Sequence, residues 1–567
     1  MRAGAADLAR LLAGCCAAIA CSLGPAAAQE PATEQKVPLS AEPAPPSAGR
    51  IPSFAELEAA GAVIGEVRID NRNIFDLTDE KENGILYRAA NAIHIRTQDW
   101  VVRRQPLFRP GERVSVRLIE ETERLMRSNR FFYDVSITPV GYRDGVVDIE
   151  ISTRDTWTLE PGASASRAGG VNKSGWSVRD TNAFGTGILI GANRTSDADR
   201  SGITYKVSQP HAFDGWTAID YSHSQLSDGQ SNAISIVRPF YAMDTRWAAG
   251  FSTSTDTRIE SQFIDAVKVA QYRHRQDSAE AFGGWSGGLV DGWAHRYSVG
   301  LSYLKDTYKV EPDLLPPPDP FPQDQTLVAP FFRYELVHDS YEKVKNRDLI
   351  ERPEYFLMGT QSKVQLGRSL TGLGSTQNLW LYSASASDGF RLPSNRVLLG
   401  SASVSGQSGY APLDRQLASA SIRFYDHHQD NRTLTFVSLA GDVLKDPILA
   451  NQLVLGGDTG LRGYPRNYQT GDHRVVFNVE ERVYTDWYPF RLIRVGGAVF
   501  FDWGRAWDGP GESPSSARWL SNVGIGLRFL STRSSFGNVL HIDFAFPLNR
   551  DPNIKSFQFL VQTKLSL

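Results

Sequence analysis

From Trp157 to the C-terminus the chain is a long series of strand-like runs, and no other feature restricts the possible folds as strongly. Turns rich in Gly, Asp, Asn and Ser separate runs of about ten residues, in which apolar and polar residues alternate. A period of two places the two kinds of side chain on opposite faces of a strand. About 400 residues of this pattern predict either a soluble β-sandwich or a closed barrel that crosses a membrane.

The last strands favour the membrane barrel. In RVGGAVFFDWGRAW one face carries Val499, Phe501 and Trp503, whereas the other carries Asp502 and Gly504. NVGIGLRF, LHIDFAF and FQFLVQTKLSL divide in the same way. An apolar face toward lipid and a polar face toward a lumen give this pattern. All three cysteines lie within the first 21 residues, so a mature sandwich would have no disulfide to support it.

The N-terminus reads as an export signal followed by a linker. Residues 1–28 combine Arg2 and Arg10, the apolar run LLAGCCAAIA and the small residues Ala26–Ala28, which are typical of a signal peptide. A rival interpretation is a lipid-attachment box ending at Cys15, but the apolar run between Arg10 and that cysteine is too short. Residues 29–60 are rich in Pro and Ala and predict a flexible leader. The net charge of -3 gives no case for nucleic-acid binding.

Residues 61–155 predict a small α+β domain. VIGEVRID, from Val63, is a strand candidate, and LYRAANAI, from Leu86, has helical spacing. The segment 113–128 is the clearest helix, and the hairpin of FFYDVSITPV and VVDIEIST follows it. This order, with PGE before the helix, NRFFYDV after it and TRDTWTL at the exit, resembles a POTRA domain. We expect VVDIEIST to present a sheet edge to client strands.

The stretch LGGDTGLRGYPRNY, within residues 455–473, carries the second resemblance. Leu461, Arg462, Gly463 and Tyr464 fit the Val/Leu-Arg-Gly-Phe/Tyr tetrad of the BamA/TamA-type outer-membrane superfamily, and RDTNAFGTG (179–187) is similar to a segment early in that family's barrel. The resemblance implies that this loop folds back into the barrel, where its arginine pairs with acidic groups on the lumen wall.

Two carboxylates are on suitable strand faces to be the partners of Arg462. By alternation Asp502 faces the lumen, and so does Glu480, which shares a face with Asn478 and Arg482. A guanidinium in a confined lumen needs such partners, because an unpaired charge there is very costly. Supporting glycines are Gly456 and Gly457 in the loop and Gly504 on the lumen side, where a small residue leaves space. Glu481 falls on the lipid side, which leaves a site near the membrane interface or a bulge as alternatives.

The resulting fold class is mainly β: a 16-stranded antiparallel transmembrane barrel, residues 157–567, preceded by one small α+β POTRA domain. Sixteen strands are what the resemblance implies, whereas about twenty strand-like runs follow Trp157. We expect the excess to be loop hairpins before the signature loop, since five runs come after it. Two departures from the family are the single POTRA module and a C-terminal Leu567 in place of Phe or Trp.

Enzyme motifs are weak in this chain. Gly284–Gly288 satisfies G-x-S-x-G, but it lies between alternating runs and no helix follows, so we expect a hairpin turn. His427 and His428 lack a third metal ligand at suitable spacing. A patatin-type phospholipase can be joined to a POTRA domain and a similar barrel, but we expect only the flexible leader before the α+β region here. We therefore predict no enzyme activity, no cofactor and no metal.

The resemblance implies a function at the bacterial outer membrane, with the POTRA domain in the periplasm. The protein would assist insertion of proteins into that membrane, or their translocation across it. Its partners would be the lipid bilayer, unfolded outer-membrane or secreted clients bound at the POTRA domain and the barrel seam, and possible accessory envelope subunits. The alternatives are a passive pore or anchoring barrel, and a two-partner-secretion transporter.

Overall fold

A computed structural model describes residues 50–197, 199–428, 432–445, 452–508, 514–532, 539–549 and 554–564. The predicted signal peptide, its cysteines, most of the leader and Leu567 lie outside the described residues. Ser53–Leu567 is one compact unit, and the description below concerns it alone. Among its described helices, none has the length and apolar character needed to cross a membrane.

A small α+β region comes first. Its three-stranded sheet has the order β1 (Val63–Arg72), β3 (Val146–Asp155) and β2 (Phe132–Arg143), with β1 parallel and β2 antiparallel to β3. The helices are α2 (Phe54–Ala59), α3 (Ile85–Ile93), α4 (Asp99–Arg103) and α5 (Val116–Arg127), with a 3-10 turn η2 (Glu80–Glu82). The predicted strand, helices and hairpin are therefore confirmed. The expectation that VVDIEIST forms an edge is wrong, because β3 is the central strand and β1 and β2 are the edges.

The core of this region explains why α5 forms where the sequence predicts it. Ile119 and Met126 lie on one helical stripe, so α5 buries both against the sheet. Val101 and Val102 of α4 and Ile149 of β3 complete the same core. One apolar stripe and one apolar sheet face thus make a two-layer unit.

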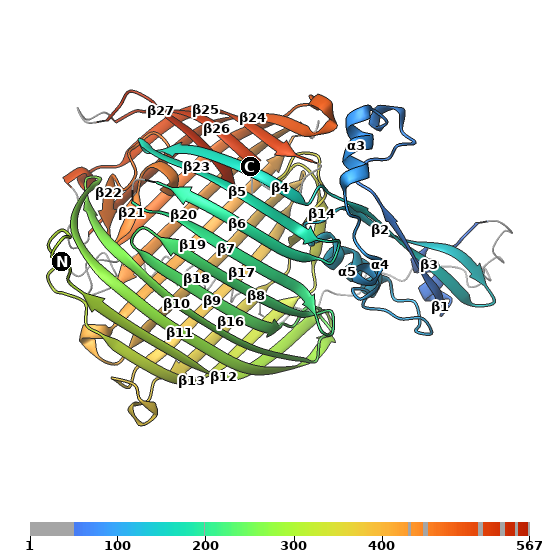
Figure 1. Cartoon of the computed structure of the whole chain (residues 1–567), viewed down its shortest axis with the longest axis horizontal. Coiled ribbons are helices and arrows are strands. Elements are labelled where there is room, and N and C mark those ends of the chain that lie inside the picture. The colour runs from blue at the N-terminus through green and yellow to red at the C-terminus, as the bar shows by residue number, and fades with distance from the viewer. Residues whose placement is uncertain are drawn as a thin grey trace, which may run out of the picture. The chain divides into compact units, whose positions relative to one another are not determined.

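The rest of the chain forms a closed barrel of 20 strands, counted over the described residues (Figure 1). In chain order these are β4 (Leu159–Ala168), β5 (Val171–Ala183), β6 (Ile188–Ser196), β7 (Ser201–Ala212), β8 (Thr217–Leu226), β9 (Gly229–Arg238), β10 (Trp247–Ile264), β11 (Val267–Val290), β12 (Trp293–Lys309), β13 (Gln325–His338), β16 (Gln361–Arg368), β17 (Trp380–Leu392), β18 (Arg396–Ser408), β19 (Arg415–His427), β20 (Thr433–Lys445), β23 (His473–Tyr484), β24 (Ile493–Trp507), β25 (Leu520–Ser531), β26 (Val539–Pro547) and β27 (Gln558–Lys564).

The expectation of 16 strands is wrong. The runs expected to be loop hairpins are paired strands of the barrel wall, and 15 of the described barrel strands precede residues 455–473. The number 16 came from the resemblance, whose motifs occupy short stretches and do not specify how many hairpins lie between them. The alternation itself is the better guide, because every barrel strand needs one lipid face and one lumen face.

The predicted faces of the last strands are confirmed. Val499, Ile525 and Leu527 are exposed on the outside of the wall, whereas Asp502 and Arg528 are fully buried inside. The barrel closes between β27 and β4 through one residue pair of the described chain, Val561 with Arg167. Among the described residues, this seam has fewer paired residues than the neighbouring β26–β27 pair.

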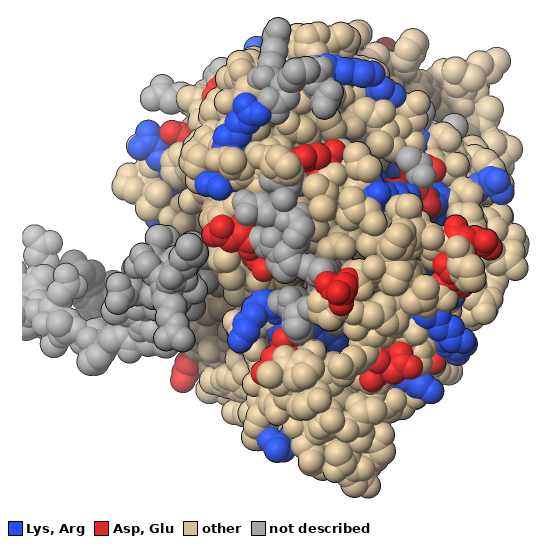
Figure 2. Space-filling model, turned by 90° about the vertical axis from the view of Figure 1, so that its left-hand side faces the viewer, with Lys and Arg blue, Asp and Glu red and all other residues tan. Residues whose placement is uncertain are grey.

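The two ends of the barrel differ. The α+β region joins one end, which we call the α+β end, and the opposite end, the loop end, carries the proline-rich segment that links β12 to β13. Figure 2 shows the loop end, where Lys and Arg are interspersed with Asp and Glu. At the α+β end, a 22-residue insert (339–360) separates β13 from β16 and contains the hairpin of β14 (Tyr341–Val344) and β15 (Glu354–Leu357).

Candidate functional site in the barrel lumen

The segment 455–473, the signature loop, leaves the end of β20 and turns back against the inner wall. Its base is a short ladder between β21 (Leu453–Leu455) and β22 (Gln469–Gly471), followed by a 3-10 turn η5 (Gly457–Thr459). Gly456 has φ of 127° and its added Cβ would lie 2.0 Å from the carbonyl oxygen of Pro465. Only glycine fits such a position, which explains the pair of glycines before the tetrad.

Arg462 lies at the inner wall in contact with both predicted carboxylates. Its Nε and Nη2 donate to the two oxygens of Asp502 at 2.9 and 2.6 Å, and its Nη1 donates to Glu480 at 2.7 Å. The guanidinium also lies 3.4 Å above the ring of Phe500. This two-pronged contact uses the planar shape of arginine, which lysine could not reproduce.

The cluster extends beyond the residues found by sequence reasoning. Asp543 approaches Arg462 at 3.4 Å and also pairs with Arg528, while Arg482 donates to Glu480 at 3.0 Å. Three guanidinium groups thus face three carboxylates among the described residues, so their formal charges balance. Sequence reasoning did not include Asp543 and Arg528 in the cluster. Alternation could have identified both, because they occupy lumen-facing positions of strands whose outer faces are apolar.

The other residues of the tetrad fix the loop against strands β25 and β26. Leu461 and Tyr464 are fully buried, and the Tyr464 hydroxyl donates to the carbonyl oxygen of Ser521 at 2.8 Å. A Cβ on Gly463 would lie 2.7 Å from the Cβ of Asn522, so the loop reaches the wall only because this residue is glycine. An added Cβ on Gly504 would lie 2.6 Å from the carbonyl oxygen of Val475 in the wall, whereas its distance of 3.5 Å from Leu455 of the loop base is an ordinary contact.

Neighbouring polar groups hold the acceptors in place. Asn478 and Asn522 donate to Asp502 at 2.9 and 2.8 Å, so this carboxylate receives amide hydrogen bonds as well as those of Arg462. A buried carboxylate with this many donors is fully satisfied. The predicted supporting residues Asn478 and Arg482 therefore both contact the carboxylates that bind Arg462.

Glu481 is on the outer face, as its parity predicts. Its carboxylate accepts a hydrogen bond from Thr435 at 2.6 Å and lies 3.3 Å from His428. The pairing of β23 with both neighbours runs without a register shift, so the alternative of a bulge is excluded. Glu481 is three residues from the end of β23 at the α+β end, which supports the interface alternative.

The remaining motifs have structural roles. Ser286 of the G-x-S-x-G motif lies near the end of β11 and donates to the carbonyl oxygen of His295 on the next strand, so it is not part of a nucleophile elbow. His427 bonds to the carbonyl oxygen of Asn346 at 2.9 Å. Within the described residues no group of three or more His, Cys, Asp or Glu side chains could hold a metal ion.

The insert 339–360 was not predicted, and it meets the same cluster from the α+β end. Ile350 and Met358 pack with Leu399, Tyr425 and other inner-wall residues in one apolar group. Arg482, which bonds to Glu480 on one side, donates to the carbonyl oxygen of Arg347 at 3.1 Å on the other. The insert and the signature loop are therefore joined through Arg482 and Glu480. The sequence feature that could have predicted this insert is a charged stretch of its length between two alternating runs.

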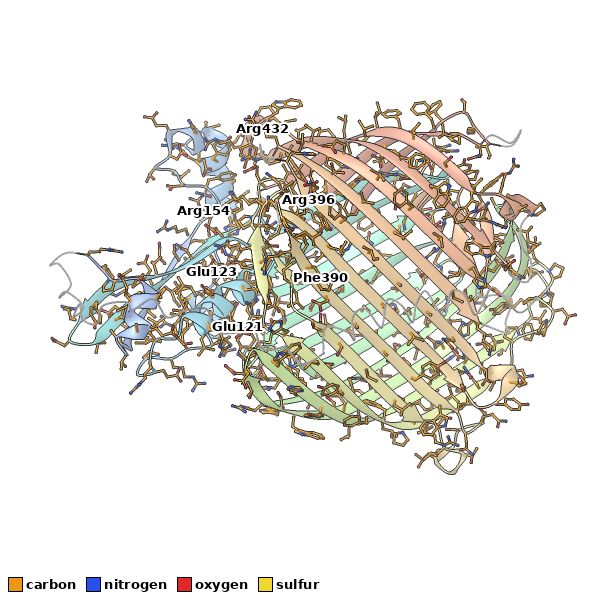
Figure 3. The ribbon with its side chains drawn as sticks, turned by 180° about the vertical axis from the view of Figure 1, so that it is seen from behind. Glu121, Glu123, Arg154, Phe390, Arg396 and Arg432 are labelled. Atoms are coloured by element: carbon orange, nitrogen blue, oxygen red, sulfur yellow. The ribbon has the colours of Figure 1, made fainter. Side chains whose placement is uncertain are left out.

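The same insert contacts helix α5 of the α+β region. Glu123 accepts hydrogen bonds from Lys343 at 3.1 Å and from the Tyr355 hydroxyl at 3.3 Å, and Arg124 lies 3.7 Å above the Tyr341 ring. Figure 3 places Glu121 and Glu123 where α5 meets the barrel. A continuous chain of contacts thus leads from α5 through the insert to the cluster around Arg462.

The exit of β3 makes a second junction with the barrel. Asp155 is fully buried and accepts hydrogen bonds from the Thr97 amide and hydroxyl at 2.7 and 2.8 Å, and Asn182 of the RDTNAFGTG segment donates to that hydroxyl. Burial raises the pKa of the Asp155 carboxyl to about 7, although the Thr97 hydrogen bonds oppose this shift. Burial lowers the pKa of the nearby His94 to about 4.

The wall formed by β16 to β20 is different, because a cavity of about 410 Å³ lies along it. Inward-facing serine hydroxyls make up most of its polar lining, together with Lys363 and the ion pair of Asp442 and Arg474. The lining residues are Gln361, Lys363, Ser385, Ala386, Ser387, Ser401, Ala402, Ser403, Ser419, Ala420, Ser421, Ala440, Asp442 and Arg474. Arg474 pairs with Asp442 at 2.8 Å and donates to the carbonyl oxygen of Val454, so the cavity borders the base of the signature loop.

The wall that holds Arg462 lies within a recognised sequence family. Residues 369–564 match the Omp85 superfamily domain, and this range includes the signature loop and every residue of the Arg462 cluster. The chain carries an Omp85 superfamily domain. The match agrees with the resemblance to the BamA/TamA-type superfamily and, together with the closed barrel, supports an outer-membrane β-barrel.

Solved structures similar to this chain share little sequence with it. BamA from Haemophilus ducreyi lacking POTRA domains 1–3 is 12% identical, with a TM-score of 0.39 over 88% of this chain and 84% of that one. CdiB from Escherichia coli is 13% identical, with a TM-score of 0.46 over 89% and 76%. CdiB from Acinetobacter baumannii is 13% identical, with a TM-score of 0.43 over 88% and 73%. A comparison with curated proteins gives no match.

Proposed function

We propose that this protein assists the insertion of client proteins into the outer membrane or their translocation across it, with the α+β region acting as a POTRA domain in the periplasm. The observation that carries the proposal is the Arg462 cluster: a charged loop held inside the lumen by buried carboxylates, within an Omp85 domain. A loop held by hydrogen bonds can be released, whereas a wall strand cannot be without opening the barrel.

The contacts of the insert support a coupled mechanism. An unfolded client bound at an edge strand of the α+β sheet, β1 or β2, would load helix α5 and thereby the insert that α5 touches through Glu123. The insert shares Arg482 with the cluster, so its displacement would weaken the hold on Arg462. The seam between β27 and β4, where the described residues form one pair, is the place where a client strand would reach the bilayer.

Reconstituted liposomes test this proposal. We expect the purified protein to accelerate the folding of a urea-unfolded outer-membrane barrel client, measured by heat-modifiable gel mobility, or to protect a secreted client from external protease. The Arg462→Ala variant should lose much of this effect, while Arg466→Ala, in the same loop but partly exposed, should retain it. Client folding and protection no faster than in protein-free liposomes would contradict the proposal.

A passive pore is the second candidate, and the cavity along β16 to β20 favours it, because small neutral side chains leave a space that solutes could occupy. A pore would leak small solutes from the liposomes without accelerating client assembly. The two candidates therefore separate in one preparation, with dye efflux and client folding measured together.

A further inference from the structure

Helix α3 has its apolar face on the outside. Ile85, Leu86 and Ile93 are 85%, 78% and 71% exposed, and no residue of this nine-residue helix is buried. Ala89 and Ala92 are exposed as well. At 3.6 residues per turn these five side chains form one continuous stripe, so the exposed face of α3 is almost entirely apolar.

The opposite face of α3 is the one that contacts the protein, and it is polar and aromatic. The Asn91 side chain exchanges two hydrogen bonds with the backbone of Phe75, at 2.8 and 3.1 Å. Tyr87 packs its ring 4.7 Å from that of Phe75. The usual arrangement of a surface helix in water, with apolar residues inside and polar residues outside, is thus reversed.

The α+β region does not use the exposed stripe for its own stability. Its core is completed by α2, α4 and α5, which contribute Leu57, Val101, Val102, Ile119 and Met126, and it includes no residue of α3. An exposed apolar helix face of this kind marks a contact surface for a membrane or another protein.

The position of α3 indicates which of these it is. The Tyr87 hydroxyl donates to the carbonyl oxygen of Phe490 at 3.1 Å, and Arg491 pairs with Asp79, just before the 3-10 turn η2, at 3.3 Å. Residues 490 and 491 belong to the turn between β23 and β24, beside which α3 lies in Figure 1. In the same turn Trp487 and Phe490 are 63% and 80% exposed, as expected of aromatic side chains at a membrane interface.

We propose that α3 is an interfacial helix whose apolar stripe inserts into the leaflet of the outer membrane at the α+β end of the barrel. The stripe then continues the lipid-facing surface of the barrel through Trp487 and Phe490. Arg88 on α3 and Arg96 shortly after it are exposed, which suits anionic phosphate groups of lipids. This contact fixes the α+β region against the bilayer at a point separate from its junctions with the barrel wall.

A fluorescent probe on α3 tests the proposal. The protein is made without its three natural cysteines, labelled with an environment-sensitive dye at Leu86→Cys, and reconstituted into phosphatidylglycerol-containing vesicles with or without doxyl-labelled lipid. Val499→Cys on the outer barrel wall, 61% exposed in the structure, is the lipid-contact control. Asp144→Cys in the exposed β2–β3 turn is the water-contact control.

We expect the Leu86 probe to be blue-shifted relative to the Asp144 probe and to lose several-fold more of its fluorescence to doxyl lipid. An emission and quenching profile equal to that of the Asp144 probe would overturn the proposal. A blue shift without quenching would also overturn it, because protein, such as a second copy of the chain, would then cover the stripe. Insertion of α3 does not require client assembly, so a failed client assay leaves this result unaffected.

Discussion

Two neighbouring sectors of the lumen wall have different chemistry, although the same alternation builds both. Strands β23 to β26 contribute three carboxylates, Arg482 and Arg528 to the inner cluster, and the inserted loop adds Arg462. Strands β16 to β20 carry mainly serine inward where a cavity lies along them. Buried charges require partners, so the first wall fills its share of the lumen, while small neutral groups leave theirs open.

The largest expected effect comes from removing the loop's cation. Arg462→Ala leaves Asp502 and Glu480 facing each other without their main partner, and loss of one member of a buried pair costs roughly 3–5 kcal/mol. The loop should detach while the barrel stays closed, which raises single-channel conductance several-fold in planar bilayers. Arg466→Ala is the control, since Arg466 pairs with the partly exposed Asp199. Equal conductance of the two variants would contradict the claim that Arg462 holds the loop against strands β23 to β26.

A smaller change tests the wall rather than the loop. Asp502→Asn keeps the shape but removes the charge that accepts two bonds from Arg462, so roughly 1.5–3 kcal/mol should be lost. The expected conductance lies between those of the native protein and Arg462→Ala. Glu481→Gln, one residue from Glu480 but on the outer face, is the matched control and should behave as native. A stronger effect of Glu481→Gln than of Asp502→Asn would reverse the assigned faces.

Along strands β16 to β20, we expect conductance to depend on the size of the inward side chains and not on their charge. Ser403 faces inward between Ser385 and Ser419, and Ser403→Phe would fill part of the cavity without touching the Arg462 cluster. We expect a moderate fall in conductance, and a larger fall in the Arg462→Ala background. Ala402→Phe, on the neighbouring outward-pointing position, should have no effect. A fall with Ala402→Phe alone would show that the wall has another register.

The smallest effect concerns a carboxylate outside the lumen, Asp155. Because its folded pKa of about 7 exceeds the ordinary 3.8, the folded state keeps a proton that the unfolded chain loses, so stability falls as pH rises across that window. The pKa of His94 is lowered from 6.5 to about 4, so its contribution to stability rises with pH and masks the fall caused by Asp155. In His94→Gln the α+β region should lose roughly 2–4 kcal/mol between pH 4 and pH 7, measured by hydrogen exchange. A flat profile in that variant would contradict the shift of Asp155.

Much of the barrel was predictable because alternation is a local property. The inward positions of Asp502 and Glu480 follow from parity within single strands, and the motif supplied Arg462. The number of strands was wrong where the resemblance replaced the pattern, since short motifs do not count the hairpins between them. The central place of β3 in the α+β sheet was also missed, because strand order depends on pairing between β1 and β3, which are far apart in sequence.

Contacts between distant segments were the least predictable part of the site. Asp543 reaches Arg462 across 81 positions of the chain, and the insert reaches Arg482 across 135. The alternation of apolar and polar residues within one strand gives no information about such contacts. The reversed helix α3 shows the same limit: its spacing predicts a helix, but only the structure shows that α4 and α5 leave its apolar face without a place in the core.

The most direct test of the charged wall is the accessibility of a thiol at Leu461, the fully buried residue beside Arg462. In the cysteine-free protein, Leu461→Cys should react very slowly with an impermeant maleimide, and adding Arg462→Ala should make the reaction many-fold faster. If both proteins are labelled equally fast, the loop is not held by its arginine, and the distinction between a filled sector and an open sector of the lumen is wrong.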